Sequence, residues 1–290
     1  MEAINVLTWK EKWISYKKHP GSFLLFLLTC LSAAITVGIL AALVIYVLVK
    51  GIPHLSPSLF QWTYTSENVS MMPAIVNTVT MTGLSLLFAV PIGVFSAIYL
   101  VEYAKRGNRL VKIVRTTTET LAGIPSIVYG LFGYLVFVIA LHFNYSMMSG
   151  ALTLAIMILP TIMRTTEEAL KSVPDSYREG SFGLGAGKLR TVFRIILPSA
   201  MPGILSGVIL AIGRIVGETA ALIYTSGTVS GVPDSLFSSG RTLSVHMYAL
   251  LSEGLHTEEA YATAVVLLVM VLLLNGLSEL AAKKMAGKDR

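Results

Sequence analysis

The chain has 290 residues, of which 54% are hydrophobic and only 13% are charged, and its mean hydropathy is +0.72. Because soluble domains carry about 25% charged residues, this composition excludes an ordinary soluble domain and predicts a polytopic membrane protein. In a soluble chain the net charge of +6 would suggest nucleic acid or acidic partners, but here we expect membrane lipid and no nucleic acid. The single cysteine, Cys30, excludes a disulfide framework and a cysteine-based metal site.

Six apolar windows follow one another along the chain, each near the length that a helix needs to cross the hydrocarbon core. They cover about 22–49, 73–100, 117–142, 147–166, 200–224 and 260–280. None shows the alternation of about ten residues that is typical of a barrel strand. We therefore predict an all-α fold with six transmembrane helices.

Most of the 22 Lys and Arg residues lie in four segments outside these windows. The segments are 1–21, 105–115, 164–194 and 281–290. By the positive-inside rule, both termini and the two long basic loops are predicted to face the cytoplasm.

The chain is predicted to begin with a cytoplasmic tail at 1–21 and a first transmembrane helix at 22–50. The apolar run of this helix is too long for a signal-peptide core, so we expect it to be retained. Five core helices at 70–280 form the main transmembrane domain, and a basic cytoplasmic tail follows at 281–290.

The outer segment 225–258 is rich in Ser and Gly. We expect a short interfacial helix near Leu243–Leu251 within it. The two histidines of this segment, His246 and His256, are expected to be solvated.

Several windows contain residues that break helices. Pro91 and Pro125 each stand near a glycine, and proline removes a backbone hydrogen bond and permits a kink. A kink at either proline could serve to adjust the helix shape for packing or act as a gating hinge, and the sequence leaves both interpretations open. Glu119 is expected at the start of the third span, where the helix dipole favours a carboxylate, with a gating role as the alternative.

Motifs for nucleotide hydrolysis are absent from the chain. The run from Gly183 to Lys188 resembles a phosphate-binding loop, but the required Gly and Ser or Thr are replaced by Phe182 and Leu189. Zinc-protease and nucleophile-elbow motifs are also missing. We therefore predict a chain that is not an enzyme and that has no cofactor and no metal site of its own.

The polar, glycine-punctuated loop at 172–198 separates two long apolar runs. We predict a helix from Pro174 to Leu184 that ends at Gly185, where a positive φ has no steric cost. A second short helix is predicted at Lys188–Ile196, after which Leu197-Pro198 turns the chain back to the membrane. A surface for a partner and an interfacial helix that rests on lipid headgroups are equally supported by these residues.

Seven residues of this loop resemble the cytoplasmic EAA motif, E-A-A-x3-G-x9-I-x-L-P, of binding-protein-dependent ABC importer permeases of type I (MetI-like). They are Glu179, Gly180, Ser181, Gly185, Ile195, Leu197 and Pro198. The spacing matches throughout, but Gly180 and Ser181 replace the two alanines, and a glycine weakens a helix by about 1 kcal/mol relative to alanine. The resemblance implies the type I importer permease fold, with the loop as a coupling helix in a cleft of a separate ATP-binding subunit.

Two further stretches, 121–133 and 202–220, are similar to phosphate-importer permeases, and more to the PstA type than to the PstC type. This resemblance implies a subunit of the bacterial cytoplasmic membrane that imports inorganic phosphate. The implied partners are a PstC-like permease, two PstB-like ATP-binding subunits that hold the ATP, and an extracytoplasmic PstS-like phosphate-binding protein. Importers of sulfate, molybdate or phosphonate are the alternative, and an ion-gradient-driven carrier is a more distant one.

Arg214 and Glu218 are charged residues within the fifth window. On a continuous helix they lie four residues apart, on one face. Because charge inside a membrane is costly and usually faces a bundle interior or a water-filled cavity, both residues are candidates for the translocation pathway. A structural ion pair that locks this helix against a partner permease is the alternative.

Overall fold

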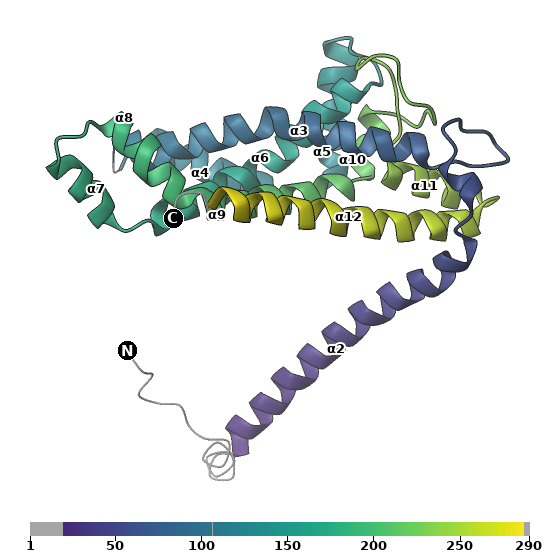
Figure 1. Ribbon diagram of the computed structural model, residues 1–290, viewed down its shortest axis with the longest axis horizontal. Coiled ribbons are helices and arrows are strands. Elements are labelled where there is room, and N and C mark those ends of the chain that lie inside the picture. Colours follow the sequence, from purple (N-terminus) through teal and green to yellow (C-terminus); the bar gives the residue numbers. More distant parts are fainter. Residues whose placement is uncertain (1–19, 106, 287–290) are drawn as a thin grey trace. The chain divides into compact units, whose positions relative to one another are not determined.

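The structure is a computed structural model that describes residues 20–105 and 107–286 (Figure 1). All regular elements of these residues are helices, and five of them are long and apolar enough to span a membrane. A bent pair of shorter helices would raise this number to six. The predicted all-α membrane fold is thus confirmed, whereas residues 1–19 of the tail predicted at 1–21 lie outside the described residues.

The chain divides into two compact units, Met1–Lys50 and Gly51–Arg290. The described part of the first unit belongs to one long helix, α2 (Pro20–Gly51), which covers the first apolar window. Its sequence has no charged residue before Lys50, as expected for a membrane-spanning helix.

The second unit contains the remaining elements. In chain order they are η1 (Ile52–His54), η2 (Pro57–Phe60), α3 (Met72–Ile98), η3 (Tyr99–Tyr103), α4 (Arg109–Ala122), α5 (Ser126–Gly133), η4 (Tyr134–Ala140), α6 (Met147–Ser172), α7 (Asp175–Gly183), α8 (Lys188–Thr191), η5 (Val192–Ile196), α9 (Leu197–Val216), α10 (Ala220–Thr225), α11 (Leu243–Glu253) and α12 (Thr257–Ala286). The elements η3, η4 and η5 are π-helical turns that prolong or join α-helices. Figure 1 shows α7 and α8 at one end of the bundle and α11 towards the other end.

The core of the second unit lies between α3, α6 and α9, which pack against one another. Fully buried Met81, Leu154 and Ile158 belong to its largest apolar cluster. A Cβ atom on Gly203 would lie only 2.6 Å from the Cβ of Ala169, and one on Gly207 would overlap the side chain of Thr165. The small residues of α9 thus permit its close approach to α6.

The third predicted span, 117–142, is wrong as a single helix. It consists of α4 and of α5 with η4, which are bent by 107° at the break around Gly123–Pro125. Because Pro125 has no backbone N–H and disfavours helical backbone in the residue before it, the chain breaks here instead of kinking slightly.

Two boundaries of the fifth predicted span also differ from expectation. Leu197-Pro198 does not turn the chain, because an unbroken helical run extends over Lys188–Val216. Pro198 lies inside this run, two residues after the π-helical turn η5, and local π-helical adjustments of this kind let a membrane helix accommodate a proline. At the other end, α9 stops at Val216 and a non-helical break separates it from α10.

The short helix predicted near Leu243–Leu251 is present as α11, and one of its faces is buried. Leu243, Val245 and Leu250 are fully buried, and His246, predicted to be solvated, is also inaccessible to solvent. Leu243 N donates a 2.8 Å hydrogen bond to Thr78 Oγ1 of α3. One face of this helix is therefore packed in the protein interior, while Tyr248 and Leu251 are exposed.

Candidate functional site

The first part of the 172–198 loop, up to Gly185, folds as its pattern predicts. Pro174 precedes the first residue of α7, Asp175 lies in the first turn, and Leu184 caps the end. Gly185 adopts φ +78°, the left-handed conformation that favours glycine. The predicted helix of 174–184 and its stop at Gly185 are therefore confirmed.

Large apolar side chains of this loop are exposed. Leu184 is 91% exposed and Leu189 is 66% exposed. Phe182, Tyr177 and Phe193 are also exposed. Exposed apolar side chains gathered in one loop are typical of a protein interaction site, and we name these five residues the docking face.

The seven motif residues do not share one environment. Glu179 and Gly180 are exposed, and a Cβ atom on Gly180 would meet nothing within 4 Å. Ser181, in contrast, is 5% exposed, and its hydroxyl lies 2.8 Å from Thr191 Oγ1 of α8. The glycine thus leaves open space on α7, while the serine attaches α7 to α8.

The second half of the motif attaches the loop to the bundle. Ile195 and Leu197 are half-buried and pack against a buried apolar cluster. The cluster consists of Ile98, Ala169, Leu170, Val173, Val192, Ile196, Ala200 and Ile204. The I-x-L-P end of the motif therefore serves packing, and the α7 end remains accessible.

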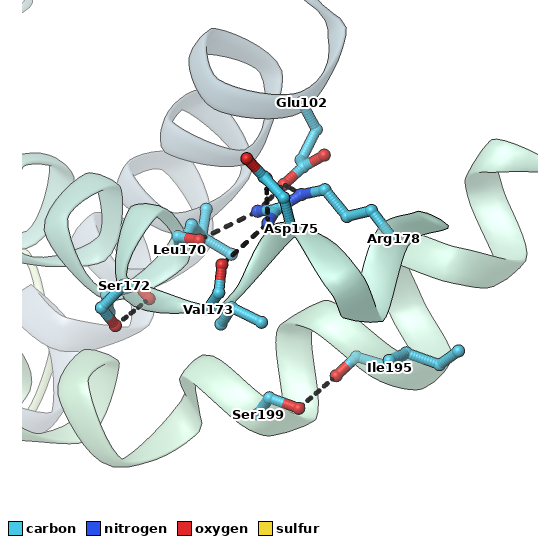
Figure 2. Close-up of polar contacts among 9 residues, drawn as sticks. Glu102, Leu170, Ser172, Val173, Asp175, Arg178, Ile195 and Ser199 are labelled. Atoms are coloured by element: carbon cyan, nitrogen blue, oxygen red, sulfur yellow. Dashed lines mark hydrogen bonds and ion pairs between the residues drawn. The ribbon is translucent and has the colours of Figure 1, made fainter. Parts of the chain in front are cut away.

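A feature that the sequence reasoning missed is the side chain of Arg178 (Figure 2). Its Nη2 and Nε atoms lie 2.7 Å and 3.2 Å from Oε1 of Glu102, which belongs to η3 at the end of α3. Nη2 also donates to the Leu170 carbonyl at 3.0 Å, and Nη1 donates to the Val173 carbonyl at 2.9 Å and to Asp175 Oδ1 at 3.2 Å. Glu102 and Arg178 are 76 residues apart, so their pairing could not be read from local spacing.

A cavity of about 390 Å³ opens between α4, α6 and α9. We call it the charged cavity because seven of its lining residues are ionisable: Arg115, Glu119, Arg164, Glu167, Glu168, Lys171 and Arg214. Hydroxyl groups of Thr118, Thr161 and Thr165 are also in its wall. The sequence reasoning selected only Glu119 and Arg214 from this set.

Ion pairs neutralise most of the charges in this cavity. The carboxylate of Glu167 forms ion pairs with Arg115, whose Nε lies 3.2 Å away, and with Lys171, whose Nζ lies 2.6 Å away. In the same way, Arg164 Nε lies 3.0 Å from the carboxylate of Glu168. Arg214 and Glu119 form neither an ion pair nor a hydrogen bond within the described residues. The cavity thus offers one guanidinium and one carboxylate without such partners.

The expected placement of Glu218 on one helical face with Arg214 is wrong, because α9 ends before it at Val216. Glu218 is 8% exposed, and its Oε1 accepts a 3.1 Å hydrogen bond from Ala221 N at the start of α10. Its backbone carbonyl accepts the Ser244 hydroxyl of α11 at 2.6 Å. Among the residues that the structure describes, Glu218 forms no ion pair with Arg214 and does not line the charged cavity.

The other predicted gate or kink positions fall in different places. Pro125 stands at the 107° break between α4 and α5, whereas Pro91 lies inside α3, which continues without interruption. Glu119 lies three residues before the end of α4 instead of at a helix start. The expected stabilisation of its carboxylate by a helix N-terminus is therefore wrong.

A second group of buried polar residues lies at the α11 end. Arg241 is 5% exposed and its guanidinium carbon lies 4.6 Å from the centre of the Tyr64 ring. The same ring makes an edge-to-face contact with His246, whose two ring nitrogens have no hydrogen-bond partner in the described part of the chain. Burial and the nearby Arg241 lower the pKa of His246 to about 3. This histidine is therefore neutral at physiological pH.

No group of three or more potential metal-ligating side chains occurs within residues 20–105 and 107–286.

Known proteins connect the loop and the cavity to one family. Residues 89–287, which include both features, match the binding-protein-dependent transport system inner membrane component. The chain belongs to this family. It is thus a multi-pass membrane component of a binding-protein-dependent transport system.

Curated relatives of this family are similar over most of their length. The chain is 34% identical to the probable ABC transporter permease protein YqgI of Bacillus subtilis, over 84% of this chain and 89% of the relative. It is 36% identical to the phosphate transport system permease protein PstA of Pasteurella multocida, over 78% of this chain and 81% of the relative.

A solved bacterial alginate ABC transporter, in complex with a periplasmic protein bound to an alginate pentasaccharide, has a similar fold, with a TM-score of 0.68 over 93% of this chain and 98% of that chain. Its sequence identity of 17% supports the likeness of fold alone. The predicted fold of a type I ABC importer permease is thereby confirmed.

Proposed function

We propose that this chain is the membrane-spanning permease subunit of an ATP-driven importer of inorganic phosphate, where it forms half of the translocation pathway. The main structural support is the charged cavity, in which the guanidinium of Arg214 has no carboxylate partner among residues 20–105 and 107–286. Similarity to PstA relatives of at least 34% identity supports phosphate as the substrate.

Arg214 suits a phosphate ion chemically. The planar guanidinium can donate two parallel hydrogen bonds to two phosphate oxygens. The hydroxyls of Thr118 and Thr165 already donate to backbone carbonyls, so among the wall threonines the hydroxyl of Thr161 is the one proposed to donate a further hydrogen bond to the ion. Because a transported ion must also leave, weak binding is required, and the carboxylates of Glu167 and Glu168 keep the local positive charge low.

Glu119 provides a basis for preferring phosphate to sulfate. Monohydrogen phosphate has a proton to donate at neutral pH, whereas sulfate has none. A carboxylate without other partners accepts that proton in a hydrogen bond and repels an anion that cannot donate one. We therefore assign Glu119 to anion selection. Import of another oxyanion is the alternative function, and substitution of Glu119 tests it.

The docking face is proposed to bind an ATP-binding subunit through α7, with Glu179, Gly180 and Gly185 on the exposed side of the motif. Hydrolysis of ATP then takes place on the partner chain, and this subunit catalyses no bond chemistry. We further propose a PstC-like second permease, two PstB-like ATP-binding subunits and a PstS-like binding protein. The location that follows is the bacterial cytoplasmic membrane, with the α7 end inside.

Two proposals concern residues with revised roles. Glu218 is proposed to cap α10 and to hold α11 instead of lining the pathway. The break at Pro125 is proposed as the flexible point between α4 and α5, because α4 contributes Arg115 and Glu119 to the charged cavity.

Uptake of labelled phosphate into proteoliposomes tests the function. The complete transporter is reconstituted with its partner subunits, with ATP inside and the binding protein outside. We expect ATP-dependent uptake that Arg214→Gln lowers at least tenfold while the complex still assembles. Arg109→Gln, an exposed arginine of α4 outside the cavity, is the matched control.

Competition by sulfate in the same vesicles tests the role of Glu119. Glu119→Gln is expected to weaken discrimination between phosphate and sulfate, because an amide can also donate a hydrogen bond to sulfate. Unchanged uptake in assembled Arg214→Gln would exclude Arg214 from the pathway. Absence of ATP-driven phosphate uptake by the unaltered transporter would reject the function itself.

A further inference from the structure

Arg178 occupies a position between the docking face and the helices that line the charged cavity. Its side chain is only 16% exposed, and that of Glu102 only 8%. All five guanidinium N–H groups can be accounted for by the contacts with Glu102, Leu170, Val173 and Asp175. A saturated, largely buried guanidinium holds α7 in one orientation relative to the ends of α3 and α6.

A second set of contacts holds the other side of the loop. The Ser181 hydroxyl pairs with Thr191 of α8, and Lys188 Nζ lies 5.0 Å from the centre of the Tyr103 ring in η3. The helical run that begins at Lys188 continues to Val216 and includes Arg214. Movement of α7 must therefore be shared with α3, α6 and α9.

The Arg178 contacts also border a second cavity, of about 440 Å³, next to the charged cavity. Arg178 and Glu102 line only this second cavity, whereas Arg115 and Lys171 line both. Arg115 and Lys171 are the two cations that hold Glu167. A shift of Arg178 thus acts on the wall that positions the charged groups of the pathway.

We propose that Arg178 is a positioning residue that transmits displacement of α7 to the ends of α3 and α6. This inference rests on the proposed function, because it assumes that an ATP-binding subunit moves α7. The residue binds neither phosphate nor ATP. Its role is to keep α7 from moving independently of the helices around the charged cavity.

The guanidinium geometry explains why an arginine is required. One side chain must reach a carboxylate and two backbone carbonyls in fixed directions, and the rigid fork of arginine does so. A lysine has a single ammonium group on a flexible stem and cannot hold all of these acceptors in one geometry. Arg178→Lys therefore keeps the charge but loses most of the orientation.

The test measures phosphate uptake and ATP hydrolysis together in the reconstituted transporter. We expect Arg178→Lys and Glu102→Gln to lower the ratio of phosphate imported to ATP hydrolysed at least fivefold, while hydrolysis by the assembled complex changes less than twofold. Arg109→Lys, an exposed arginine of α4 without hydrogen bonds or ion pairs within the described residues, should leave the ratio unchanged.

A reversible cross-link between positions 102 and 178 distinguishes a positioning role of Arg178 from a role in folding. In a chain with Cys30→Ala, the pair Glu102→Cys and Arg178→Cys is joined by a short bifunctional thiosulfonate reagent that a reductant cleaves. The linked form is expected to recover at least half of the normal ratio, and reduction should remove that gain.

The outcomes distinguish the two proposals. If the unaltered transporter shows no ATP-driven uptake, the proposed function fails. If it does, and the Arg178 variants keep a normal ratio or the link restores nothing, the positioning role of Arg178 is rejected. Equal losses of uptake and hydrolysis would also overturn it, because they would indicate a structural role in assembly.

Discussion

The two short helices α7 and α11 have similar lengths, with 9 and 11 residues, but opposite environments. Each was predicted as a surface element. In α11 Leu243 and Leu250 have no exposed surface, whereas Leu184 at the end of α7 is 91% exposed. Because burial of apolar surface is stabilising, the comparison supports the proposal that α7 is covered by another chain.

Paired leucine truncations give the largest expected effect on this comparison. Leu250→Ala should lower the free energy of unfolding by about 2–5 kcal/mol, because it leaves a cavity in a packed core. Leu184→Ala should stay within about 0.5 kcal/mol, since its side chain makes little contact within the chain.

Thermal unfolding of the purified subunit in detergent measures both truncations. Co-purification with the ATP-binding subunit then provides the converse readout, in which Leu184→Ala should weaken the association several-fold. Equal effects of the two substitutions on unfolding would contradict the assignment of α7 as the uncovered helix.

The pH dependence of stability tests the buried end. The pKa of His246 falls from 6.5 in the unfolded chain to about 3 in the fold, so the unfolded chain takes up a proton as the pH falls below 6.5 and the folded chain does not. The stabilisation is complete above pH 6.5 and is lost as the pH falls towards 3. At pH 5 the loss attributable to this group is about 2 kcal/mol.

His246→Phe should remove that part of the pH dependence, because the aromatic ring is kept against Tyr64 and Arg241 without a titrating group. Unfolding midpoints at pH 7 and pH 5 for both proteins provide the measurement. An identical shift in the two would show that His246 is not responsible.

Glu218 offers the smallest and most discriminating effect, at the junction of α10 with α11. Glu218→Gln keeps an oxygen that can accept from Ala221 N, so uptake should fall less than threefold. Glu218→Ala removes this cap and should cost about 1 kcal/mol of stability. A tenfold loss of uptake in the assembled Glu218→Gln transporter would contradict the capping role and would indicate that Glu218 lines the translocation pathway.

The loop was well predicted up to Gly185 because its determinants there are local. A proline before α7 and a glycine with positive φ after it each act on their immediate neighbours. The interior was predicted less well, because the spacing of residues on a helix was used without asking where that helix ends. Arg214 and Glu218 were placed on one helix by their spacing, yet the chain leaves the helix at Gly217, between them.

The third span failed for a related reason. Its apolar composition resembles a continuous helix, but the pair of breakers at Gly123 and Pro125 produces a 107° bend. Composition reports that a segment prefers an apolar environment, whereas backbone hydrogen bonding decides whether it remains straight.

The amino-acid sequence by itself determined the helical membrane fold, the spacing of the 172–198 loop and the family, because hydropathy and local backbone preferences act over short distances along the chain. Only the tertiary structure decided that Arg178 meets Glu102, that Arg115, Glu167 and Arg214 share one cavity, and that one face of α11 is buried. These contacts join residues that are far apart in sequence, and they depend on how closely α3, α6 and α9 pack, which no local pattern contains.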